Sequence, residues 1–88
     1  MQLTSLKNIG GDLNCLGNKE ITENSFPALE QVGGDLILAG SGFTRLPASL
    51  QIVNGRGILS IKDPISLLLA MQEAVENGII KGGIFFCD

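Results

Sequence analysis

A repeat with a spacing of 23 residues constrains this chain more than any other feature of its sequence. The segment LTSLKNIGGDL, residues 3–13, returns as FPALEQVGGDL at residues 26–36. The glycine pair Gly10–Gly11 recurs as Gly33–Gly34, and each pair is followed by aspartate and leucine. A fixed period in this range is typical of a solenoid, in which each unit buries its apolar side chains only by stacking on the next.

The chain is 88 residues long, which predicts one small domain over residues 1–88. Hydrophobic residues make up 44% of it, more than a disordered segment carries, and twelve glycines suit a backbone that turns tightly. We expect an α/β fold, a short right-handed solenoid with about four parallel strands and one helix in the C-terminal half. Its repeat units are expected at about residues 3–25, 26–45 and 46–62, followed by a helix over residues 64–77 and a final strand within residues 79–88.

Short strands are predicted directly after each glycine pair. In the first unit, the alternation of side chains along a strand points Leu13 and Cys15 inward. The second unit repeats this pattern and leaves Ile37 outside. Because strands joined by repeated return segments lie parallel with right-handed crossovers, we expect one sheet in the order 1-2-3-4. The four strands are placed near residues 12–16, 35–39, 58–61 and 84–87.

The third and fourth strands are less regular than the first two. The third unit opens as LPASLQIV, and its corner NGRG is interpreted as longer than GGD. This places Leu59 and Ile61 inward and Ser60 outward, and a shift of one residue would reverse the assignment. In the last segment, IIKGGIFFCD, the inward positions belong to Ile84 and Phe86.

One helix is predicted between the third and fourth strands. Asp63 is placed as its N-cap and Pro64 at its first helical position, where the missing N–H does no harm. The pair Asn77–Gly78 ends the helix. An apolar stripe along it indicates packing against the core, and the members of the stripe are Ile65, Leu68, Met71 and Val75.

The repeated pattern F/L-P-x-L-x-x-V-G-G-D-L-x-L-x-G resembles bacterial leucine-rich repeats of the short "GGDLxLxG … LP" kind. It is also similar to the repeats of receptor L domains, which commonly carry a Val-Gly-Gly-Asp-Leu corner. The likeness extends over residues 3–50. Both families present a sheet that binds other molecules, so the resemblance implies a protein-binding module as a fold-level analogy.

The residue types present argue against an enzyme. The chain has no histidine, tyrosine or tryptophan, so a Ser-His or Cys-His nucleophile is impossible. Asp12 and Asp35 occupy matching positions about 4.8 Å apart, where two carboxylates could hold a cation or shift each other's pKa. Arg56 stands at the third matching position and would neutralise Asp35, which favours a salt-bridged corner. A small metal-dependent enzyme is the least favoured alternative, and we expect no cofactor.

Charge and hydropathy limit the partners of the chain. Six basic and nine acidic residues give a net charge of −3, and the basic ones are scattered, so we expect no nucleic-acid binding. The longest apolar run, residues 65–71, falls far short of the ~20 residues that span a bilayer, so we expect no membrane insertion. The first residues lack a secretory signal pattern, which predicts a cytoplasmic protein. Cys15 and Cys87 fit neither a disulfide framework nor a zinc motif, and Cys15 is expected in the core.

A row of outward side chains is the candidate binding site. Stacking of the predicted strands brings four outward positions side by side, namely Asn14, Ile37, Ser60 and Phe85. Exposed apolar clusters tend to mark interfaces, so Ile37 and Phe85 indicate a protein–protein interface. Two interpretations compete with this one: these apolar side chains are ordinary surface residues, or the helix packs on them.

The ends of so short a stack suggest an alternative function. The first turn exposes strand edges and apolar side chains such as Leu3 and Leu6, and the last strand has a free edge unless the helix shields it. Self-association would cover both ends, so the alternative prediction is a self-assembling structural protein, and in either case we expect a homo-oligomer. The sequence leaves open whether the helix lies on the sheet face or across an end.

Overall fold

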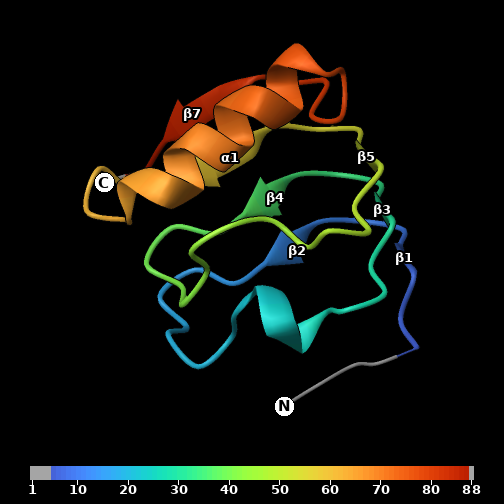
Figure 1. The fold of residues 1–88 in the computed structure, drawn as a ribbon, viewed down its shortest axis with the longest axis horizontal. Coiled ribbons are helices and arrows are strands. Elements are labelled where there is room, and N and C mark those ends of the chain that lie inside the picture. Colours follow the sequence, from blue (N-terminus) through green and yellow to red (C-terminus); the bar gives the residue numbers. More distant parts are fainter. Residues whose placement is uncertain (1–4, 88) are drawn as a thin grey trace.

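The chain winds into successive turns whose strands form two parallel sheets (Figure 1). The computed structural model describes residues 5–87. One sheet has the order β1-β3-β5, with strands Asn8–Ile9, Gln31–Val32 and Ile52–Val53. The other has the order β2-β4-β6-β7, with strands Leu13–Asn14, Leu36–Ile37, Gly57–Leu59 and Ile84–Phe86.

The four-stranded sheet confirms the predicted parallel order, whereas the three-stranded sheet has no counterpart in the prediction. Its strands hold two residues each, which is too short for an alternating pattern to be visible in the sequence. They form because each corner binds the turn before it: the Gly33 N–H donates to the Ile9 carbonyl over 2.7 Å, and the Asn54 N–H donates to the Val32 carbonyl over 3.0 Å. A bridge between Val53 and Ile80 extends this pairing to the fourth turn.

The third turn begins its strand earlier than predicted. Its corner, residues 54–56, has the same length as the corner at residues 33–35, so Gly57 pairs with Leu36. A glycine therefore stands at an inward position that leucine holds in the turns before it. Met71 from the following helix fills the vacant space, because a Cβ on Gly57 would meet the end of its side chain.

The observed register and the turn that follows the strand correct two predictions, namely which residue pairs with Ile37 and which way Ser60 and Ile61 point. Ile58, and not Ser60, pairs with Ile37 on the outer side of the sheet. Ser60 is only 8% exposed and Ile61 is 70% exposed, which reverses their predicted positions. The chain turns away from the strand at Ser60 because the N–H of this residue donates to the Asp63 carboxylate over 2.8 Å.

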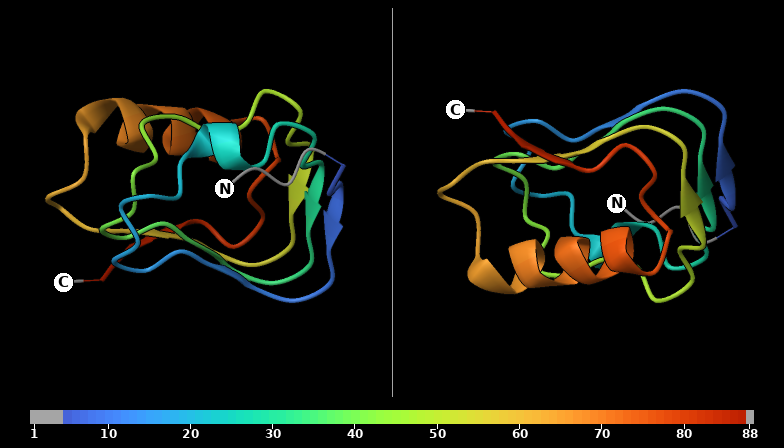
Figure 2. Two further views of the ribbon diagram at one scale, coloured as in Figure 1. Left: turned by 90° about the horizontal axis from the view of Figure 1, so that it is seen from below. Right: turned by 90° about the horizontal axis from the view of Figure 1, so that it is seen from above.

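The helical return segments lie across the core from the four-stranded sheet. The first return segment contains the 3₁₀ helix η1 (Glu23–Ser25), with Thr22 and Ser25 forming a capping box. The third contains the α-helix α1 (Ile65–Glu76). Figure 2 shows η1 and α1 on one side of the molecule and the strands β2, β4, β6 and β7 on the other. The helix therefore leaves the outer face of that sheet uncovered, and by outer face we mean the face turned away from the core.

The helix begins one residue later than predicted. Pro64 is its N-cap, and no side-chain hydrogen bond caps it. The Asp63 carboxylate instead accepts hydrogen bonds from the N–H groups of Ser60 and Gly40. Ile65 of the predicted stripe is exposed, and the helix side chains buried in the core are Leu67, Met71 and Ala74. Within residues 5–87, no helix combines the length and apolar character needed to cross a membrane.

An apolar core fills the space between the sheets and the return segments. Phe43 is fully buried and stacks on Phe26, with ring centroids 6.4 Å apart and an interplanar angle of 19°. Cys15 is buried as predicted, and burial raises the pKa of its thiol. The other buried apolar side chains are Leu13, Leu29, Val32, Leu36, Leu38, Ala39, Leu50, Val53, Leu59, Leu67, Met71, Ala74 and Ile80.

The two ends of the fold differ from each other. Phe86 is in register with the buried Leu59, yet it is 53% exposed because β7 is the last strand of its sheet. At the other end, Leu6 packs partly buried against the core. Leu3, which the sequence suggested as a second exposed apolar side chain there, lies outside the described residues.

Candidate functional site

The outer face of the four-stranded sheet carries one side chain from each strand in direct register. The parallel pairing aligns Asn14 with Ile37, Ile37 with Ile58, and Ile58 with Phe85. Side chains at such paired positions on neighbouring strands contact one another. Phe85 is 47% exposed, Asn14 is exposed, and the two isoleucines are partly buried. We call these four residues the outer row.

Three of the four predicted site residues belong to this row, and the fourth does not. Asn14, Ile37 and Phe85 are brought together as expected. Ser60 is turned into the protein, and Ile58 takes its place. The equal number of residues between the repeated valines and the start of each strand is the sequence signal that identifies Ile58.

A charged pair borders the apolar end of the outer row. The Arg56 guanidinium lies 3.1 Å from the Asp35 carboxylate, which confirms the predicted neutralisation of Asp35. Its Cζ also lies 5.1 Å from the centroid of the Phe85 ring, within the range of a cation–π contact. Half of the Arg56 side chain is exposed, so it presents a partly neutralised cation beside an exposed aromatic ring.

The repeated aspartates act as connectors between turns. The Asp12 carboxylate accepts a hydrogen bond from the Asp35 N–H over 2.7 Å, and the Asp35 carboxylate accepts one from the Arg56 N–H over 2.8 Å. A Cβ on Gly34 or Gly55 would collide with these carboxylates, which explains why glycine precedes Asp35 and Arg56, the residues whose N–H groups bind them. Within residues 5–87, no cluster of three or more acidic, cysteine or histidine side chains is placed to hold a metal ion.

A buried carboxylate, that of Glu23, joins the return segments on the far side of the core. Glu23 accepts hydrogen bonds from the Thr44 N–H and the Thr44 hydroxyl, each over 2.9 Å, and the Arg45 guanidinium lies 3.9 Å away. Burial by itself raises the pKa of Glu23, but the hydrogen bonds from Thr44 and the charge of Arg45 outweigh it and hold the pKa below its usual value. Sequence reasoning missed this residue because a glutamate in a polar loop carries no signal of burial.

The stability of the fold is expected to fall in acid because of Glu23 and Asp35. The backbone N–H and the guanidinium of Arg56 lower the pKa of Asp35, so both carboxyl groups have lower pKa values in the folded chain than in the unfolded chain. Their contribution to stability is therefore present above the ordinary values of 4.5 and 3.8 and is lost as the pH drops through the folded values.

This pH dependence is measured as the melting temperature, by circular dichroism between neutral pH and about pH 2, a range that spans ordinary carboxyl values. The double variant Glu23→Gln/Asp35→Asn retains acceptor oxygens but cannot ionise at these two positions. We expect its melting temperature to depend less on pH than that of the natural chain. Parallel curves for the two proteins would show that other carboxylates cause the acid sensitivity.

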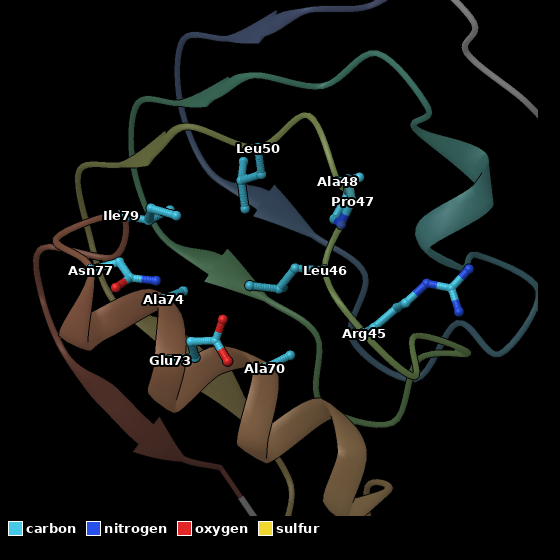
Figure 3. A pocket seen from close by; sticks show the side chains of 10 residues that line it. All are labelled: Arg45, Leu46, Pro47, Ala48, Leu50, Ala70, Glu73, Ala74, Asn77 and Ile79. Carbon is cyan, nitrogen blue, oxygen red and sulfur yellow. The ribbon is translucent and has the colours of Figure 1, made fainter.

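A groove of about 240 Å³ lies between α1 and residues 45–50 (Figure 3). It belongs to the side of the molecule that carries α1, across the core from the four-stranded sheet (Figure 2). Arg45 points toward η1, where it pairs with Glu23, while Glu73 and Asn77 lie on the helix side of the groove. The rest of the lining is apolar and consists of Leu46, Pro47, Ala48, Leu50, Ala70, Ala74 and Ile79. This lining brings no nucleophile beside a base, so the groove offers no constellation for covalent catalysis.

Comparison with known proteins adds no relative to this description. No protein-family model matches the chain, and no curated protein or solved structure matches it. What the chain does therefore has to be inferred from its own surfaces. Of these, the outer row is the one in which the repeat itself aligns apolar side chains on an uncovered face.

Proposed function

We propose that the chain is a non-enzymatic protein-interaction module, a short right-handed solenoid of the leucine-rich-repeat kind, which binds a protein partner through the outer face of its four-stranded sheet. The observation that carries this proposal is the outer row: Asn14, Ile37, Ile58 and Phe85 stand in register on a sheet face that the helix leaves uncovered (Figure 2).

The composition of the row and its border suits an interface. Ile37, Ile58 and Phe85 form an apolar strip, Arg56 lies over its aromatic end, and Asn14 is polar at the other end. Aromatic residues and arginine are enriched at the energetically dominant centres of protein interfaces, and polar residues at their rims. This arrangement favours a partner that lays an apolar segment along the strip.

The backbone beneath the row supports binding without large rearrangement. Hydrogen bonds between neighbouring turns fix it, including Cys15 N–H to the Ile37 carbonyl and Leu38 N–H to the Ile58 carbonyl, each over 2.8 Å. The aspartate connectors hold the same strands at their starts. A surface that is already ordered loses little conformational entropy on binding, which favours affinity.

Replacing the two central isoleucines by asparagine tests the proposal. Asn14 already occupies the equivalent position of the first turn, so Ile37→Asn and Ile58→Asn are compatible with the local backbone. If the row is the binding centre, each change is expected to weaken the complex by about tenfold, the effect of removing a contact worth about 1–2 kcal/mol. Partners are recovered by affinity capture and identified, and the dissociation constant is then measured by calorimetry with purified proteins.

The matched control is Leu69→Asn, which changes an exposed apolar side chain on α1, across the core from the outer face. This variant should bind the recovered partner as tightly as the natural chain. Melting curves establish that all three variants are folded. Equal affinity of the outer-row variants and the natural chain would refute the assignment of the binding face.

A further inference from the structure

The last turn of the fold ends in an apolar surface with a free strand edge. Among residues 5–87, no strand lies beyond β7 in the order β2-β4-β6-β7. Phe86 occupies a position that faces the core in the turns before it, but it is 53% exposed. The exposed side chains of Ile65 and Leu69 lie one helical turn apart on α1, and a hollow lined by Gln72, Val75, Glu76 and Ile84 lies between α1 and β7.

The first turn carries a docking surface that no described residue occupies. In each later turn, the corner glycine lies against the backbone of the turn before it, and a Cβ on Gly33, Gly55 or Gly82 would collide with that backbone. Gly10 and Gly11 are the equivalent glycines of the first turn, yet no described residue apart from the chain neighbours lies within 4 Å of a Cβ built on either. The first turn therefore presents the same glycine surface as the later turns, but residues 5–87 contain no turn that packs against it.

We infer that a second copy of this chain fills this place, so that β7 of one copy stacks beside β2 of the next in a head-to-tail contact. Within the chain, Lys81 N–H donates to the Val53 carbonyl and Gly82 N–H donates to the Gly55 carbonyl, each over 2.9 Å. The same two bonds would form between copies, from Gly10 N–H to the Ile80 carbonyl and from Gly11 N–H to the Gly82 carbonyl. The contact thus repeats a pairing that the chain already makes between its own turns.

The alignment of inward side chains within the chain also continues across the contact between copies. Extending the register places Ile84 beside Leu13 of the next copy and Phe86 beside its Cys15. The side chains that meet on the inward side of the sheet are therefore apolar at both positions. The exposed ring of Phe86 would be covered. No carboxylate meets another one in the corner, because the next copy's Asp12 falls beside Gly83.

The end face is large enough for a specific contact. The fold measures 31 × 27 × 20 Å, and its turns follow one another along the middle dimension (Figure 1). An end face of 31 × 20 Å has a projected area of about 600 Å², so full contact between two such faces would cover about 1,200 Å² in total, which is the lower end of the range for specific interfaces. Because two different surfaces meet, the contact leaves a free end on each side and generates open filaments or rings and not closed dimers.

The first experiment measures molecular mass by light scattering over a concentration series. The natural chain is expected to grow beyond a dimer as its concentration rises. Gly11→Val should remain monomeric, because the added side chain blocks the incoming turn. At a concentration where the natural chain is also monomeric, the two melting temperatures should agree, since the Cβ meets no described residue of its own chain apart from its chain neighbours. Phe86→Asp should also remain monomeric, because it places a charge in the apolar contact.

The outer-row variant Ile58→Asn serves as the control, and it should assemble like the natural chain. Loss of assembly with retained partner binding, or the reverse, therefore separates this inference from the proposed function. A natural chain that stays monomeric, a dimer that does not grow, or Gly11→Val protein that assembles normally would overturn the head-to-tail contact.

Disulfide trapping tests the register of the contact. The register that aligns Asn14 with Phe85 also aligns position 16 with position 87, so the extended pairing places these two positions about one strand spacing, 4.8 Å, apart across the contact, within the reach of a disulfide. Leu16→Cys/Cys87→Ser protein is mixed under mild oxidation with the natural chain, whose Cys87 is exposed. Mixed dimers are expected to form faster than with the control Lys19→Cys/Cys87→Ser, and equal rates would overturn the register.

Discussion

Replacing Phe43 by alanine is expected to lower the free energy of unfolding by about 3–5 kcal/mol. Phe43 is fully buried and stacks on Phe26, so it ties the second return segment to the start of the second unit. A chain of 88 residues has a total stability of about 4–13 kcal/mol. The loss therefore takes away a large share of the total, and urea denaturation followed by circular dichroism measures it.

Phe86→Ala is the matched comparison, because Phe86 is half-exposed at the edge of its sheet. Truncating it at low protein concentration should cost clearly less than truncating Phe43, since much of its surface already contacts water. Equal losses for the two variants would contradict the view that Phe43 anchors the core.

Alanine at Gly55 is expected to destabilise the fold by about 1–3 kcal/mol, as overpacking does in a close-packed site. The added methyl group would collide with the Asp35 carboxylate and the Gly34 backbone. To make room, the carboxylate would have to move away from the Arg56 N–H, to which it is bound at 2.8 Å. Urea denaturation of the variant and the natural chain measures the difference.

The same substitution at Gly11 should be neutral or should stabilise the chain by about 0.4–1 kcal/mol. Gly11 has a backbone conformation open to alanine, and no described residue apart from its chain neighbours lies within 4 Å of a Cβ built there. The pair of variants separates two roles of the repeated glycines. If Gly11→Ala destabilised the chain as much as Gly55→Ala, the glycines would serve backbone freedom and not the close approach of turns.

The order of the four-stranded sheet was predictable because identical motifs occupy identical places in successive turns. The third turn was harder to predict because Gly57 stands where the first two turns carry leucine, so this glycine was assigned to a longer corner and not to the strand. The side chain that replaces the leucine, Met71, comes from a helix later in the chain, so only the packed structure identifies it. The same holds for Asp63, whose neighbours suggested a helix cap although its carboxylate binds the N–H groups of Ser60 and Gly40.

In the candidate site too, contacts between repeated positions were predictable and contacts made by the irregular segments were not. The pairing of Asp35 with Arg56 followed from matching positions in neighbouring repeats. The contact of Arg56 with Phe85 and the bonds of Glu23 with Thr44 did not, because they depend on how the irregular segments place side chains in space. The repeat period therefore predicts which side chains align on neighbouring strands. It does not predict the contacts that side chains from the irregular segments make beside them.

The strand pairings also determine how the native fold opens. Each strand pairs only with the strand of the adjacent turn, and no pairing within residues 5–87 joins β2 directly to β7. Separation of the first turn therefore breaks one set of hydrogen bonds and leaves those of the last turn in place. Amide protons of the middle strands should exchange with solvent slowly, and those of the outermost turns quickly. The ends are thus the places where the backbone is most often accessible to another chain.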